Sequence, residues 1–158
     1  QSDTLTSNVH VSSSRIPDRM IQGQPARESV ATSATNQRLG SMTYSYDRES
    51  GHLVIDSVRV ENGARLNGVN QQLLQNAVRE NPNVKSIGSR YLTETNEQVV
   101  RKALDAGASC EEAIRGTPAY RTRSNLGFSV IRNASCEYRR TPAGEVTGVN
   151  VRFDAFRP

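Results

Sequence analysis

One stretch, residues 53 to 81, constrains the fold more than any other part of the chain. Residues 53 to 60 (LVIDSVRV) read as a strand with apolar side chains on both faces, which is typical of a strand inside a sheet. Two Asn-Gly pairs follow, and apolar residues then recur at helical spacing from Val69 until Asn81-Pro82 ends the run. The stretch predicts a central strand, a glycine-bearing loop and a helix.

The flanking segments predict a mixed sheet. Residues 42 to 46 alternate apolar and hydroxyl side chains, and the turn residues 47 to 51 join them to the central strand as a β-hairpin. Residues 84 to 91 read as a further strand, and residues 95 to 106 as a helix that ends at Gly107. Since a helix separates the central strand from the strand at 84 to 91, the pattern predicts a parallel β-α-β unit.

The C-terminal part predicts antiparallel structure. Residues 110 to 115 read as a short helix, after which Gly116-Thr-Pro118 interrupts the pattern. Residues 127 to 131 and 146 to 153 read as strands, and the turn residues 141 to 144 favour an antiparallel hairpin. The predicted fold class is therefore α/β (α+β), with a mixed central sheet and a C-terminal antiparallel hairpin.

The first 37 residues differ in composition from the rest. They are rich in Ser, Thr, Asn and Gln and contain no aromatic residue, so they bury too little apolar surface to offset the entropy of ordering. We expect residues 1 to 37 to be disordered and residues 38 to 158 to form one domain. The alternative is that residues 16 to 21, with Val30, dock on that domain as a short element.

Charge and hydropathy exclude several classes of partner. The net charge of +4 comes from 20 cationic and 16 anionic residues, too mild an excess to predict nucleic-acid binding. The arginines at 121, 123, 139 and 140 are expected to be solvated surface charges. No run approaches the roughly 18 apolar residues of a membrane-spanning helix, so no membrane partner is expected.

Cysteine and histidine are scarce. Cys110 and Cys136 are too few for a disulfide framework, and His10 and His52 are too few for a multi-histidine metal centre. We therefore expect inert thiols, no metal site and a reducing, cytoplasmic compartment.

The loop after the central strand carries the clearest chemical signal. A helix start leaves unsatisfied backbone N–H groups and a partial positive charge, and Gly68 lets the backbone approach a bulky anion. Arg65 adds a full positive charge. The loop predicts a phosphate-binding site.

Here the sequence resembles the GNAT (Gcn5-related) N-acetyltransferase family, whose acetyl-CoA loop reads Arg/Gln-x-x-Gly-x-Gly/Ala between a central strand ending in Val and a helix opening with Leu-Leu. Val60, Arg65, Gly68 and the pair Leu73-Leu74 fall in this register, whereas Asn70 departs from it. The resemblance implies acetyl-CoA as co-substrate, bound by the segment around the loop. The implied binding residues are Val60, Arg65, Leu66, Asn67, Gly68, Val69 and Asn70.

A second part of the resemblance follows the strand at 84 to 91. The family places there an Asn that helps hold the cofactor, which Asn96 matches, and then a helix that carries a Tyr and closes with Gly-Phe. In one register that helix ends at Gly107; in the other, which we prefer, an insertion precedes Leu126-Gly127-Phe128 and Tyr120 is the nearest tyrosine. The candidate catalytic residues are Asp56 and Glu94 as bases and Tyr120 as proton donor.

The resemblance implies an N-acetyltransferase that passes an acetyl group directly from acetyl-CoA to an amine of a protein or small molecule. The alternative is a GNAT-like module that has lost catalysis and only binds its partner. The polar start of the chain also resembles a type III secretion signal, so that this module would be an effector acting on a host protein.

Overall fold

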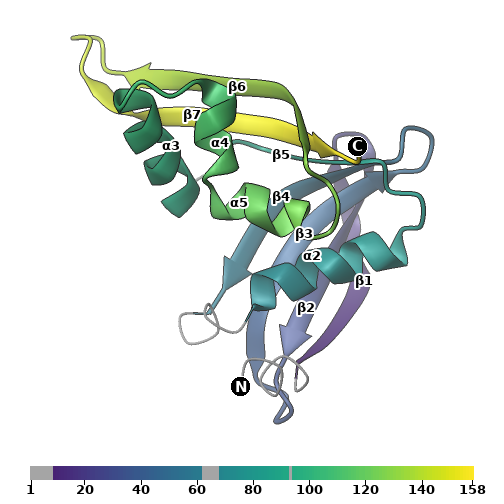
Figure 1. The fold of residues 1–158 in the computed structure, drawn as a ribbon. Helices are drawn as coiled ribbons and strands as arrows, with labels where there is room; N and C mark the ends of the chain where they lie inside the picture. Colours follow the sequence, from purple (N-terminus) through teal and green to yellow (C-terminus); the bar gives the residue numbers. More distant parts are fainter. Residues whose placement is uncertain (1–8, 62–67, 93) are drawn as a thin grey trace. The chain divides into compact units, whose positions relative to one another are not determined.

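A computed structural model describes residues 9–61, 68–92 and 94–158, and the chain divides into two compact units, Gln1–Lys85 and Ser86–Pro158 (Figure 1). The sequence predicts instead a single domain that starts at residue 38.

Unit 1 is an antiparallel sheet with one described helix. The strands follow one another in the order β1-β2-β3-β4, and α2 contacts all four of them (Figure 1). The hairpin and the helix predicted from residues 42 to 81 are confirmed. The elements are β1 (His10–Ile21), β2 (Gln24–Thr32), β3 (Arg38–Asp47), β4 (His52–Val60) and α2 (Val69–Glu80).

The predicted disorder of residues 1 to 37 is wrong for β1 and β2. A two-residue turn joins these strands, with φ of 49° at Gln22 and 80° at Gly23, the positive values that a tight hairpin turn requires. Ile21 and Ala26 are buried with Val54 of β4, and Ile16 packs against this cluster. Composition underestimates the tendency of such segments to form strands, because much of their stabilisation comes from backbone hydrogen bonds to β3 and from small buried residues.

Helix α2 lies close to the sheet because a glycine faces it. A Cβ at Gly40 would lie 2.8 Å from the carbonyl oxygen of Arg59 and 3.2 Å from Cγ1 of Val69. Leu73 and Leu74, which belong to α2, are buried. At its C-terminal end, Nδ2 of Asn81 donates to the carbonyl oxygen of Ala77 at 2.8 Å.

Unit 2 is a three-stranded antiparallel sheet in the order β5-β7-β6 with helices that pack on β6 and β7. The predicted helices at 95–106 and 110–115 and the C-terminal hairpin are confirmed, and the helix after Thr117, which carries Tyr120 and ends before Leu126-Gly127-Phe128, agrees with the preferred register of the resemblance. None of the helices in the described part of the chain is long and apolar enough to cross a membrane. The elements are β5 (Ser86–Ser89), α3 (Thr95–Asp105), α4 (Cys110–Arg115), α5 (Pro118–Ser124), β6 (Val130–Arg140) and β7 (Val146–Phe156).

The expectation of two inert thiols is wrong, because Cys110 and Cys136 form a disulfide with their Cα atoms 5.7 Å apart. The bond ties the first residue of α4 to the middle of β6. Their separation of 26 residues concealed the pairing at the level of sequence. Disulfides persist in oxidising compartments, so the argument for a reducing, cytoplasmic compartment no longer holds.

A half-buried ion pair joins α3 to the β6–β7 hairpin. Nη2 of Arg139 lies 2.8 Å from Oε2 of Glu97, and Nη1 of Arg139 donates to Oδ1 of Asn150 at 2.8 Å. The guanidinium crosses directly above Gly148, where a side chain would displace it. The hydrogen bond from Arg139 is the largest cause that holds the pKa of Glu97 below the ordinary value of a glutamate side chain. Arg139 is thus a structural contact, not a solvated surface charge.

We predict that loss of the disulfide destabilises unit 2. A loop of this length contributes about 3 kcal/mol in the chain-entropy model. Cys136→Ser should therefore lower the free energy of unfolding by roughly that amount, measured by urea denaturation. The double variant Cys110→Ser/Cys136→Ser should behave like the single variant, and a reductant should destabilise only the wild type. Equal stability of the wild type with and without reductant would contradict the prediction.

The Glu97–Arg139 pair predicts a pH dependence. Because the pKa of Glu97 is lower in the folded state than in the unfolded chain, its stabilisation is present above the unfolded pKa and is lost as the pH falls through the folded pKa. Glu97→Gln should cost about 1 kcal/mol at pH 7, a value discounted for partial solvent exposure. Chemical denaturation of both proteins between pH 7 and pH 3 should show this difference shrinking towards acid pH. A difference that stays constant with pH would count against the ion pair.

Candidate functional site

The end of β4 and the start of α2 lie beside each other in unit 1. Val60, the last residue of β4, pairs with Gly40, and the fully buried Val69 opens α2. Gly68 is the N-cap of α2 with φ 70° and ψ 20°, the left-handed region that favours glycine. The predicted ligands Arg65, Leu66 and Asn67 lie outside the described residues.

Helix α2 begins without the side chains that usually satisfy a helix start. Its N-cap, Gly68, has no side chain to cap it, its first turn holds no acidic residue, and Asn70 is exposed there. By contrast, Ser109 and Glu112 form a capping box at α4, and Thr117 caps α5. The donors and the partial positive charge at the start of α2 therefore suit an anion.

Asp56 is the extra residue of a β-bulge. Thr43 pairs with Ser57 and Tyr44 pairs with Ile55, so the β3–β4 register shifts by one residue at Asp56. Its side chain is 8% exposed, and its Oδ2 lies 2.8 Å from Nη2 of Arg19. The guanidinium of Arg19 therefore occupies one of the two oxygens of this carboxylate.

Glu94, the N-cap of α3, has an unusual backbone conformation. Its φ of 55° and ψ of −123° match the first central position of a type II′ turn, where glycine is the favoured residue. The side chain is exposed and does not cap the helix. Strain of this kind costs about 1 to 3 kcal/mol, and neither packing nor capping accounts for a glutamate at this position.

Asn96 and Tyr120 lie near each other at the N-terminus of α5. Oδ1 of Asn96 accepts from the backbone N–H of Ala119 at 2.9 Å, and Oγ1 of Thr117 accepts from the N–H of Tyr120 at 3.1 Å. Together with Pro118, which has no N–H, these bonds complete the helix start. The structure thus brings two of the predicted site residues together within unit 2.

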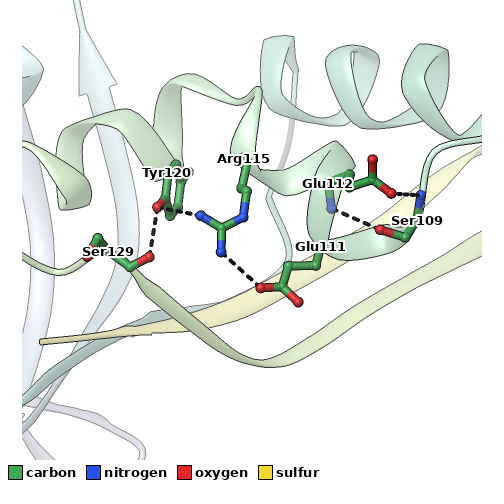
Figure 2. Close-up of polar contacts among 6 residues, drawn as sticks. All are labelled: Ser109, Glu111, Glu112, Arg115, Tyr120 and Ser129. Carbon is green, nitrogen blue, oxygen red and sulfur yellow. Dashed lines mark hydrogen bonds and ion pairs between the residues drawn. The ribbon is translucent and has the colours of Figure 1, made fainter. Parts of the chain in front are cut away.

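The hydroxyl of Tyr120 makes two hydrogen bonds (Figure 2). It donates to the carbonyl oxygen of Ser129 at 2.7 Å and accepts from Nη1 of Arg115 at 3.0 Å. Nη2 of Arg115 in turn lies 3.1 Å from Oε1 of Glu111. Arg115 was not predicted as a site residue, although its four-residue spacing from Glu111 on a predicted helix is a signal of an ion pair.

Arg123 is buried, contrary to the prediction of a surface charge. It is 4% exposed, lies over the ring of Phe153 at 5.4 Å and donates to the carbonyl oxygen of Ala119 at 2.7 Å. Burial lowers its pKa to about 10, so it remains a cation at neutral pH. Tyr120 contacts the same Phe153 ring, with centroids 6.4 Å apart.

No protein-family model matches the chain, and no curated protein matches it in sequence. Two acetyltransferases are among the similar solved structures. Nourseothricin acetyltransferase (TM-score 0.50, 13% identity) matches over 96% of this chain and 88% of its own. The spermidine/spermine N-acetyltransferase SpeG from Vibrio cholerae (0.52, 9%) matches over 96% and 94%.

The third structure is the NatC complex bound to Gag peptide and CoA, with a TM-score of 0.50 and 13% identity over 83% of this chain and 71% of that chain. Identities this low establish the fold and not the substrate. The order of the elements and the junction of β4 with α2, marked by Val60 and Gly68, fit the fold of these three structures. The chain has the fold of the GNAT (Gcn5-related) N-acetyltransferase superfamily.

Proposed function

We propose that the protein is an acetyl-CoA-dependent N-acetyltransferase. The observation that carries the proposal is the start of α2, where a left-handed glycine N-cap, which has no capping side chain, follows the central strand of a GNAT fold. CoA presents a diphosphate, and backbone donors at a helix start bind such an anion. The structural neighbours include a complex with bound CoA, which supports acyl-CoA as the co-substrate.

In this proposal the loop and the helix start hold the cofactor. Arg65 supplies a cation for the diphosphate, while the backbone from Leu66 to Asn70 supplies donors, and Val60 offers the strand end beside the pantetheine arm. Asn96, at the start of α3, is a further proposed ligand of the cofactor. The acetyl carbonyl is then attacked by an amine nitrogen, the thioester C–S bond breaks, and CoA leaves as a thiolate.

Two proton transfers complete the reaction, and the contacts of the candidate residues decide how well each one suits its transfer. Glu94 suits the base that takes the amine proton, because it is exposed and its strain has no other explanation in the described structure. Asp56 suits that role less well, since Arg19 holds it. Tyr120 is the proposed donor of a proton to the thiolate. Its hydrogen bond to the carbonyl oxygen of Ser129 must break before it can donate that proton.

A catalytically inactive binding module is the second candidate function. The hydrogen bonds of Tyr120 and Asn96 within unit 2 favour it, because both side chains have structural duties. Such a module would bind acyl-CoA or a partner without turnover, as in an effector secreted to act on a host protein. Turnover measurements separate it from the enzyme.

The proposed cofactor site predicts the effect of a charge reversal. Arg65→Glu should weaken acetyl-CoA binding roughly 10- to 100-fold, because a hydrogen bond to a charged group contributes about 1.5 to 3 kcal/mol. Isothermal titration calorimetry measures this change. Arg79→Glu, at the other end of α2, is the matched control and should leave the affinity within about twofold of the wild type. Similar affinities of the two variants for acetyl-CoA would contradict the assignment of this loop to the cofactor site.

The strain at Glu94 predicts opposite effects on stability and activity. Glu94→Gly should raise the free energy of unfolding by about 1 kcal/mol, because glycine adopts the observed dihedral angles without strain. The same change should lower kcat by roughly two orders of magnitude through loss of the base. Glu94→Gln keeps the strained backbone and should lose activity without gaining stability. Full activity in both variants would exclude Glu94 as the base.

A further inference from the structure

The sheet of unit 1 has one face that α2 does not cover. In β3, Gly40 faces α2, and Met42 and Tyr44 share that face by strand alternation. The intervening side chains therefore point to the opposite face, where Oγ of Ser57 donates to Oγ1 of Thr43 at 3.2 Å. We call this surface the hydroxyl face; its members on β3 and β4 are Ser41, Thr43, Ser45 and Ser57.

Arg19 reaches the carboxylate beside this face from an irregular part of β1. The β1–β2 register shifts between Arg15 and Met20, so residues 16 to 19 lie outside regular pairing. Within them, Asp18 has a φ of 57°, which is uncommon for a residue other than glycine. Ile16 packs on the apolar cluster and anchors the segment.

The contact between Arg19 and Asp56 is asymmetric. The Asp56 side chain is 8% exposed, whereas that of Arg19 is 50% exposed. The buried carboxylate is therefore neutralised from within the chain, and the guanidinium extends into solvent. A guanidinium carries five N–H donors, and the described structure gives Arg19 one hydrogen bond, to Asp56.

This arrangement distinguishes between classes of amine. A polyamine approaching Asp56 meets a cation that already holds the carboxylate, whereas an amine that also carries a carboxylate finds donors on Arg19. Arginine binds carboxylates well because its planar donors match their geometry.

We propose that Arg19 determines acceptor specificity by selecting amines that carry a carboxylate over amines that are purely cationic. The inference rests on the proposed acetyltransferase function, and it adds the substrate class to it. L-Lysine and cadaverine form a matched pair of probes, since cadaverine is lysine without its carboxylate.

The experiment measures thiol release from acetyl-CoA with each probe. The wild type should favour lysine in kcat/KM by about tenfold or more, the usual scale of a charge-assisted hydrogen bond. Arg19→Gln removes the cation from a buried carboxylate and risks misfolding, so Arg19→Gln/Asp56→Asn is the principal variant. It should turn over the two probes with kcat/KM values within about threefold of each other. Arg19→Lys should keep part of the preference.

Arg38→Gln is the matched control. Arg38 is also half-exposed in unit 1, where its Nη2 lies 3.5 Å from Oε2 of Glu28. This variant should keep the full preference for lysine. If the wild type uses cadaverine as well as lysine, or if the double variant keeps the preference, the proposal is overturned.

A binding measurement covers the case of slow turnover. In protein saturated with CoA, lysine should raise the melting temperature of the wild type more than cadaverine does, and the double variant should lose this difference. Equal shifts in the wild type overturn the proposal about Arg19. Calorimetry with acetyl-CoA tests the underlying function independently: a wild type that does not bind acetyl-CoA refutes the acetyltransferase, whereas one that binds it but shows no preference refutes only the role of Arg19.

Discussion

The contact between Val69 and Gly40 sets the position of helix α2 on its sheet. A side chain at residue 40 would collide with the Arg59 carbonyl and with Val69, and so would push the helix away from β4. Leu73 and Leu74 then hold the next turn in the core. The start of α2 thus lies beside the end of β4, and the proposed anion site depends on this close packing.

Unit 2 depends on contacts that hold its central helices in place, since these helices are too short to be stable alone. Helix α4 has six residues and α5 has seven, well below the length at which isolated helices persist. The disulfide, the capping bond from Asn96 and the hydrogen bond from Arg115 to Tyr120 attach them to their surroundings. Each bond that positions Tyr120 also restrains it, which is why the same contacts support both an enzyme and a binding module.

Arginine side chains pack against the aromatic rings of unit 2. Each of its six aromatic rings lies near an arginine guanidinium, at centroid distances between 4.2 and 5.7 Å. A planar cation stacks on a ring and covers apolar surface with its stem. The pairs are Arg115 and Tyr120, Arg123 and Phe153, Arg132 and Phe156, Arg140 and Tyr138, Arg152 and Tyr91, and Arg157 and Phe128.

The sequence by itself determined the features that depend on neighbouring residues. Helices α2 and α4 and the β3–β4 hairpin follow from periodicity, caps and turn residues within a few positions of each other. The glycine at the start of α2 belongs to this class, as does the family motif around it. Tertiary structure decided that the polar residues 10 to 32 form strands, that Cys110 meets Cys136, and that Arg19 holds Asp56. These features arise from partners 26 or more residues apart or from ladder bonds to another strand, and such contacts leave no periodic trace in the chain.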